Sequence, residues 1–258
     1  MRRIVFPIAL LALAACGGKH VSFTGDLRYG KTAEEDYQSG IDEMKAESWP
    51  EAVKFFEHVK TKYPFSQYAA LSDLRIADTK FKQERYLEAA DAYDGFSKLH
   101  PTHDEVDYAE YRAGVARFKD APGDWLLFPP SFEKDQRQLV KAVESLKTFV
   151  QKRPQSKYAP DAQKLLGEAE ARLAAHEWYV ADFYYKRKRW AGAAGRLQGL
   201  VDKYPDSKHD VQALFRLAEA YQKMDERTRA QRALQQLIAR HPQDPRRPEA
   251  EQLLAKLR

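Results

Sequence analysis

One short pattern occurs five times along the chain and restricts what it can fold into. In each copy an alanine lies twelve residues before a proline, with large apolar residues four and seven positions after the alanine. The alanines are Ala52, Ala89, Ala142, Ala193 and Ala230, and the prolines are Pro64, Pro101, Pro154, Pro205 and Pro242. Offsets of zero, four and seven fall on one face of a helix, and a proline ends the helix one loop later. The pattern therefore predicts five amphipathic helices of the same kind.

Small residues precede these helices at positions where a partner helix would cross closely. Gly40, Ala77 and Ala218 lie twelve residues before their alanines, and we expect Gly114 and Gly167 to take this place in the third and fourth copies. The longer distances in those two copies indicate insertions. Two helices per copy, in this order, are typical of tetratricopeptide repeats. The sequence predicts an all-α tetratricopeptide-repeat solenoid of five helix pairs with enlarged third and fourth repeats.

The two enlargements differ in composition. Residues 161–189 contain no proline and have apolar residues at helical intervals, so we expect one longer helix there. Residues 119–131 contain three prolines and a glycine, which exclude a continuous helix. The loop predicted there carries Trp125 and Phe128 at its tip, and these side chains either pack on the groove or bind a partner.

The N-terminal residues predict an export signal followed by a lipid anchor. Residues 1–15 hold two arginines and then an apolar run too short to cross a bilayer, which is typical of a signal peptide. The run ends in Leu-Ala-Ala before Cys16, the single cysteine of the chain and the expected site of lipidation. Acyl chains there would hold the chain on the membrane, and Gly17 in place of an aspartate favours the outer membrane, facing the periplasm.

These features divide the chain into three parts. We predict a signal peptide at 1–15, a lipidated flexible tether at 16–32 and a solenoid at 33–258. The solenoid is divided into the repeats 33–69, 70–106, 107–159, 160–210 and 211–258.

No arrangement of residues in the sequence predicts catalysis or a cofactor. Phosphate-binding glycine loops and nucleophile elbows are absent from the sequence, and one cysteine cannot form a cysteine-based metal cluster. His100 and His103 resemble a metal pair, but His100 and His241 share a repeat position directly before the proline, which favours a turn. A formal net charge of +5 spread along 258 residues does not indicate nucleic-acid binding. We expect a non-enzymatic chain without metal or cofactor.

The first helices of the pairs line the concave surface of such a solenoid and offer a groove for an extended peptide. Projection of the helical period places five candidate residues toward this surface: Tyr37, Asp78, Phe81, Tyr108 and Tyr111. Packing between adjacent repeats is the alternative explanation for the same aromatic residues.

Several longer motifs resemble the BamD family, the lipoproteins of the outer-membrane barrel-assembly machinery. They include Tyr63-Pro-Phe-Ser-Gln-Tyr-Ala69, Pro154-Gln-Ser-Lys-Tyr-Ala-Pro-Asp-Ala162, Tyr184-Tyr-Lys-Arg187 and Trp190-Ala-Gly-Ala-Ala-Gly-Arg-Leu-Gln-Gly199. The Leu-Ala-Ala sequence before Cys16, which is the lipobox of bacterial lipoproteins, and the two enlarged repeats also agree with the family. In the third-repeat loop, residues 131–137 only approximate the family pattern.

The resemblance implies a non-catalytic scaffold that binds the periplasmic domains of a BamA-like barrel subunit and other assembly lipoproteins. It also implies that the chain helps to deliver unfolded outer membrane proteins, and that its N-terminal repeats bind an extended segment of them. Arg196 matches a family arginine that faces the barrel subunit, where a guanidinium would pair with an acidic residue. The alternatives are a pilotin-like lipoprotein for secretin assembly and a cell-wall-associated repeat scaffold.

Overall fold

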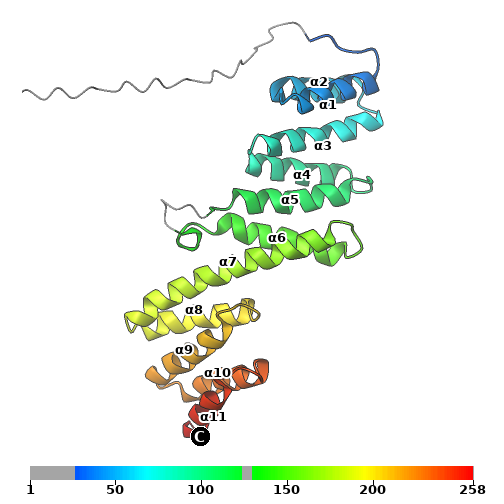
Figure 1. Ribbon diagram of the computed structural model, residues 1–258. Helices are drawn as coiled ribbons and strands as arrows, with labels where there is room; N and C mark the ends of the chain where they lie inside the picture. The colour runs from blue at the N-terminus through cyan, green and yellow to red at the C-terminus, as the bar shows by residue number, and fades with distance from the viewer. Residues whose placement is uncertain (1–26, 124–129, 258) are drawn as a thin grey trace, which may run out of the picture.

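The computed structural model describes residues 27–123 and 130–257, and every regular element within these ranges is helical. The helices are α1 (Ala33–Lys45), α2 (Trp49–Lys62), α3 (Gln67–Lys82), α4 (Tyr86–Leu99), α5 (Val106–Asp120), α6 (Arg137–Lys152), α7 (Ala159–Lys186), α8 (Trp190–Lys203), α9 (Asp210–Lys223), α10 (Arg227–Arg240) and α11 (Arg247–Lys256). Figure 1 shows them stacked as successive helix pairs along one elongated molecule. The predicted all-α solenoid of five helix pairs is confirmed, and α11 follows the fifth pair.

The repeated apolar pattern forms the core of each pair. The five repeat alanines are 0 % exposed, as are the residues four positions later: Phe56, Tyr93, Leu146, Leu197 and Leu234. Full burial of one such large side chain contributes about 1.5–3 kcal/mol. The alanine allows the paired helix to approach, and the larger residues fill the space on either side.

Glycine is required where two helices of a pair cross most closely. A Cβ added at Gly40 would lie 2.6 Å from the Phe56 ring, and one at Gly114 would lie 2.7 Å from Cδ2 of Leu146. Both neighbours are fully buried and have no free space to move into. These contacts confirm the close-approach positions expected at Gly40 and Gly114.

The expectation for Gly167 is wrong. Gly167 is exposed, and a Cβ placed there would meet no atom within 4 Å. Ala181 is fully buried and packs with Ala193 and Leu197, so it is the close-approach residue of the fourth pair. Ala181 lies twelve residues before Ala193, which is the spacing of the regular repeats. The insertion therefore precedes the crossing point, because the extra turns of α7 are added at its N-terminal end.

Helix α7 belongs to two cores. It has 28 residues and is about 40 Å long, as expected for a single extended helix over this stretch. Its first half packs on α5 and α6 through Leu166, Ala169 and Leu173. Its second half packs on α8 and α9 through Ala181. This helix joins the N-terminal and C-terminal halves of the solenoid (Figure 1).

The third-repeat segment is not a continuous helix in its described parts. Helix α5 ends at Asp120, a short 3-10 helix covers Ser131–Glu133, and α6 begins at Arg137. The 3-10 turn is attached to α7, since a ring nitrogen (Nδ1) of His176 lies 2.6 Å from the carbonyl oxygen of Phe132.

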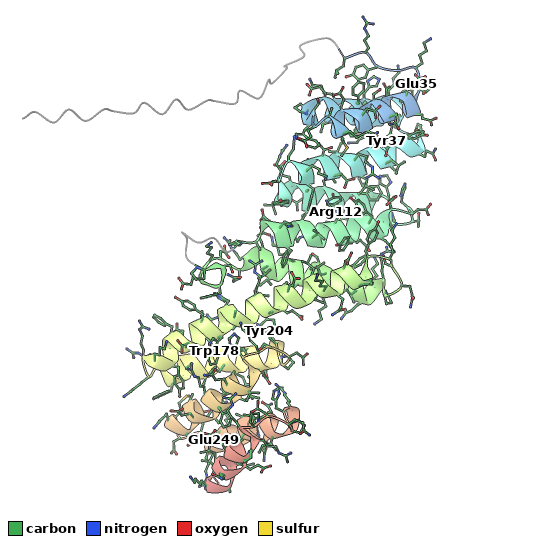
Figure 2. All side chains as sticks on the ribbon, in the orientation of Figure 1. Glu35, Tyr37, Arg112, Trp178, Tyr204 and Glu249 are labelled. Atoms are coloured by element: carbon green, nitrogen blue, oxygen red, sulfur yellow. The ribbon has the colours of Figure 1, made fainter. Side chains whose placement is uncertain are left out.

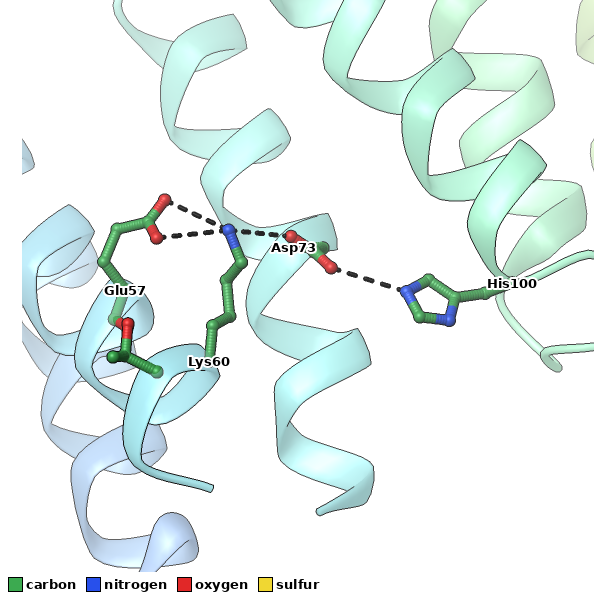
Figure 3. Close-up of polar contacts among 5 residues, drawn as sticks. Glu57, Lys60, Asp73 and His100 are labelled. Carbon is green, nitrogen blue, oxygen red and sulfur yellow. Dashed lines mark hydrogen bonds and ion pairs between the residues drawn. The ribbon is translucent and has the colours of Figure 1, made fainter. Parts of the chain in front are cut away.

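Charged side chains connect neighbouring pairs at the edges of the stack. Figure 3 shows Lys60 of α2 between the carboxylates of Glu57 and Asp73, with Nζ 3.0 Å from Oδ1 of Asp73. The other oxygen of Asp73 lies 3.4 Å from Nε2 of His100, at the end of α4. Burial opposes the charge of Lys60, but the two carboxylates raise its pKa above the ordinary value. One acid thus bridges three consecutive helices.

Candidate functional site

The predicted groove residues meet at a cluster of aromatic and arginine side chains on α1, α3, α4 and α5. We call it the aromatic–arginine cluster, and its members are Tyr37, Arg75, Asp78, Phe81, Tyr93, Tyr108 and Arg112. Figure 2 labels Tyr37 of the first helix pair and Arg112 of the third, with the α3–α4 pair between them. The cluster brings together four of the five candidates predicted for the groove.

Asp78 is the centre of this cluster and is 7 % exposed. Its Oδ1 accepts hydrogen bonds from the hydroxyls of Tyr93, at 2.6 Å, and Tyr108, at 2.8 Å. Its Oδ2 forms an ion pair with Arg75. A buried carboxylate is stable only when it is paired and hydrogen-bonded in this way. Asp78 therefore lies beneath the groove surface and orients the residues that reach it.

Two arginines bring positive charge to the cluster. The Nε of Arg75 donates to the hydroxyl of Tyr37 at 3.1 Å. The guanidinium of Arg112 lies 3.7 Å from the centre of the Phe81 ring, and its Nε donates to the Tyr93 hydroxyl at 3.3 Å. Two guanidinium groups and the one carboxylate of Asp78 leave the cluster with a net positive charge.

Protonation states in the cluster follow from burial. Burial first, and then the Asp78 carboxylate, raise the pKa values of Tyr93 and Tyr108 well above the ordinary value for tyrosine. Both hydroxyls keep their protons and remain donors to Asp78. Burial opposes the charge of Arg75, but Asp78 raises its pKa. The two tyrosines therefore stay neutral and Arg75 stays charged across the physiological pH range.

A hollow of about 600 Å³ opens beside Arg75. Its walls combine apolar and charged residues, and they are Ile41, Met44, Lys45, Glu47, Trp49, Arg75 and Lys82. Apolar walls with a few charged groups are typical of sites that bind peptides or small molecules.

The fifth candidate, Tyr111, lies on the same helix as Tyr108 but contacts the next layer. Its ring stacks on Tyr158 at 5.2 Å between centroids, and Tyr158 also contacts Tyr108. Tyr111 extends the aromatic surface from the cluster to the start of α7.

The arginines of the cluster were not among the predicted groove residues, although the sequence contains a signal for them. Arg75, Arg112 and Arg216 each lie two residues before the small residue of their repeat. Arg216 also lies over aromatic rings, 4.4 Å from Trp178 and 4.7 Å from Tyr185. The recurring arginine could have been recognised as a residue that contacts aromatic side chains, over the ring for Arg112 and Arg216 and at the hydroxyl for Arg75.

Arg196 lies on a different surface, on α8. Its side chain is 47 % exposed, and its Nη1 lies 3.2 Å from Oε2 of Glu177 on α7. Gly195 and Gly199 beside it have no neighbouring atoms within 4 Å of an added Cβ, so the backbone of α8 is open to close approach. A shallow hollow of about 350 Å³ covers this glycine-rich face of α8.

Three of the predicted site residues lie outside the described ranges. They are Cys16, the expected lipidation site, and Trp125 and Phe128 of the third-repeat loop.

The histidine pair has local bonding partners. His100 contacts Asp73, and Nδ1 of His103 accepts the backbone N–H of Glu105 at 3.0 Å. Within residues 27–123 and 130–257, no cluster of three or more His, Cys, Asp or Glu side chains could hold a metal ion. The same residues include no helix long and apolar enough to span a bilayer.

The helix pairs and the two surfaces define the class of protein, a tetratricopeptide-repeat scaffold. The sequence profile of the YfiO family, described as outer membrane lipoprotein, matches residues 30–237. This chain belongs to that family.

Several similar proteins are outer membrane protein assembly factors of other bacteria. The outer membrane protein assembly factor BamD of Neisseria meningitidis serogroup B is 29 % identical over 255 residues, covering 95 % of this chain and 93 % of the relative. BamD of Caulobacter vibrioides is 28 % identical over 219 residues, covering 84 % of this chain and 68 % of the relative.

Solved repeat proteins are more distant. The TPR2AB domain of yeast Sti1, solved as a pHSP90 complex, is 15 % identical, with a TM-score of 0.41, covering 87 % of this chain and 84 % of that chain.

Proposed function

We propose that this chain is an outer-membrane lipoprotein scaffold of the barrel-assembly machinery. The observation that carries the proposal is the family match across residues 30–237, together with BamD relatives aligned over most of their length. The match favours this role over a pilotin-like lipoprotein or a cell-wall scaffold. A surface of helix pairs suits binding and positioning of other proteins, so the role needs no catalytic step.

The first part of the proposal is membrane attachment through lipid on Cys16, on the periplasmic face of the outer membrane. We expect Cys16→Ser to leave the chain unprocessed or soluble in the periplasm, since no helix of the described residues could replace the anchor. Fractionation with a carbonate wash measures this. Recovery of the variant in the washed membrane fraction, without its partners, would contradict the proposal.

The second part is that the aromatic–arginine cluster receives an extended segment of an unfolded outer membrane protein. Tyr37, Tyr108 and Tyr111 supply aromatic contacts, and the net positive charge of the cluster suits a carboxylate on the segment. Arg112 is the residue best placed to donate hydrogen bonds to this carboxylate. Its one hydrogen bond within the cluster goes to Tyr93, so most of its N–H donors are left for a ligand.

The test uses a peptide with a C-terminal aromatic residue, once with a free carboxylate and once amidated. Tyr111→Ala should weaken crosslinking of both peptides, at a cost of about 1–2 kcal/mol. Arg112→Gln should weaken only the free carboxylate form. Equal effects of Arg112→Gln on both peptides, or a matching loss of thermal stability, would indicate that these residues only pack the repeats.

The third part is that the α8 surface around Arg196 binds the barrel subunit. Arg196 is exposed at the edge of an open glycine-rich helix face, so a partner can approach the backbone and place an acid beside the guanidinium. Within the chain, the guanidinium of Arg196 donates to Oε2 of Glu177 at 3.2 Å.

We expect Arg196→Glu to lose co-purification with the barrel subunit, because two carboxylates would then oppose each other at a cost of several kcal/mol. The variant should stay folded and membrane-bound. Glu177→Gln is the matched control, since it removes the internal partner and keeps the arginine. Wild-type recovery of the barrel subunit by Arg196→Glu in moderate salt would refute this assignment.

A further inference from the structure

Four consecutive cations form the turn between α7 and α8. We call Lys186, Arg187, Lys188 and Arg189 the basic turn, and all four are exposed. The turn lies at the end of the longest helix, at the left edge of the molecule in Figure 1.

The basic turn differs from the equivalent turns of the other repeats in the charge at one position. Four turns between first and second helices hold a non-glycine residue at positive φ: Glu47 at 58°, Glu84 at 60°, Lys188 at 55° and Asp225 at 60°. Three of these residues are acids. The backbone geometry is therefore compatible with an acid, and the turn itself does not require the lysine.

The internal partners of the basic turn do not neutralise it. Lys186 pairs with Asp182 at 2.6 Å, and Asp182 also bonds Arg216 at 2.7 Å. Arg187 donates to the backbone carbonyl of Phe183 at 3.2 Å and lies 3.6 Å over its ring. Within the described residues, the ion pairs of the basic turn are limited to the one with Asp182. A strong local positive charge therefore faces solvent.

Exposed aromatic side chains lie next to these cations. Phe183 is 45 % exposed and Tyr179, one helical turn earlier, is 39 % exposed. Tyr179 contacts the half-buried Phe132, with ring centroids 5.3 Å apart. Phe132, Tyr179 and Phe183 thus form an aromatic stripe along α7 that ends at Arg187.

We propose that the basic turn and this aromatic stripe contact an anionic phospholipid surface. Aromatic rings favour the boundary between headgroups and acyl chains, and adjacent cations gain energy from anionic headgroups. An acidic protein is the alternative occupant, and lipid labelling and protein co-purification distinguish the two. The family is described as outer membrane lipoprotein, so a membrane surface lies near this chain, and the contact goes beyond the proposed role in assembly.

The test uses the full chain reconstituted into vesicles of phosphatidylcholine alone or with phosphatidylglycerol. A photoactivatable phospholipid headgroup labels residues near the surface, and mass spectrometry locates the labels. We expect labelling within 179–189 on the anionic vesicles and a large decrease in high salt. Lys188→Glu/Arg189→Glu places two acids where the last turn has Asp225 and Glu226, and it should fold normally because Glu84 adopts the same backbone conformation as Lys188. Labelling should fall about fivefold for each cation removed.

The matched control is Lys141→Glu/Lys147→Glu, which makes the same charge change at exposed positions of α6 and should leave the labelling unchanged. Equal labelling of the wild type on neutral and anionic vesicles would overturn the proposal. It would also be overturned if the basic-turn variant kept its lipid labelling but lost the barrel subunit, because the surface would then bind protein. Co-purification of that subunit measures the assembly role separately.

Discussion

Two helical glycines show how a single contact decides whether a residue can be replaced. Gly114 and Gly167 both lie inside helices, where glycine costs about 1 kcal/mol relative to alanine. Gly114 is required by the buried side chain of Leu146, whereas Gly167 faces open space. Substitution by alanine should therefore change the free energy of unfolding in opposite directions at these two positions.

We expect Gly114→Ala to lower the free energy of unfolding by about 1–3 kcal/mol, because the new methyl group overlaps Leu146 in a packed core. Gly167→Ala should raise it by about 1 kcal/mol. Denaturant unfolding monitored by circular dichroism measures both. A destabilised Gly167→Ala variant would mean that α7 crosses its neighbour at Gly167 after all.

His209 makes the stability of the C-terminal half depend on pH. Burial, and then the charge of Lys208, lower its pKa below the ordinary 6.5, and its ring stacks on Trp178 at 5.1 Å. The unfolded chain takes up this proton at higher pH than the folded chain, so stability falls as the pH drops below about 6.5.

We expect His209→Phe to keep the stack and to lose less stability than the wild type between pH 7 and pH 5, two values chosen on either side of about 6.5. Lys208→Gln should show an intermediate loss of stability with falling pH, because burial still lowers the pKa of His209. Thermal unfolding across this range measures the slopes. Identical slopes for all three proteins would show that His209 titrates normally.

At the scale of elements, the turns inside the helix pairs carry backbone strain. The left-handed conformation at Glu84 and its equivalents costs a non-glycine residue about 1–2 kcal/mol. Backbone hydrogen bonds close these turns, as the bond from the Arg85 N–H to the carbonyl of Lys80 illustrates.

Glu84→Gly should raise the free energy of unfolding by about 1 kcal/mol, since glycine adopts this conformation without strain. Glu88→Gly, four residues later inside α4, should lower it by a similar amount. Calorimetric midpoints of the two variants should move in opposite directions. A decrease for both would indicate that glycine flexibility outweighs the strain.

For the whole molecule, α7 is the element that makes five pairs one cooperative unit. Repeat stability is a sum of neighbouring contacts, and the contacts between the two halves pass through this helix. A break in its middle should uncouple them.

We expect Ala171→Pro, at an exposed position near the centre of α7, to split one unfolding transition into two. Ala171→Gly is the control and should lower stability by about 1 kcal/mol while keeping one transition. Guanidinium unfolding followed by circular dichroism and limited proteolysis distinguishes the two cases. A single transition for the proline variant would show that α7 does not couple the halves.

Local spacing in the sequence determined the core and the order of the helices. Each pair is built from residues within about one repeat, where the helical period and a terminating proline specify which side chains face inward. The alanine positions, the long α7 and the interruption before α6 could all be predicted for this reason. Tyr37, Asp78, Phe81 and Tyr108 were placed on the correct helices by the same period.

Only the tertiary structure decided what those residues contact. Asp78 bonds Tyr93 and Tyr108, which lie 15 and 30 positions away, and Arg196 bonds Glu177 on another helix. The choice of Ala181 over Gly167 also depended on where α7 meets α8. Such contacts depend on the angles and offsets between helices. Those arise from the packing of whole side-chain surfaces, which a one-dimensional repeat does not encode.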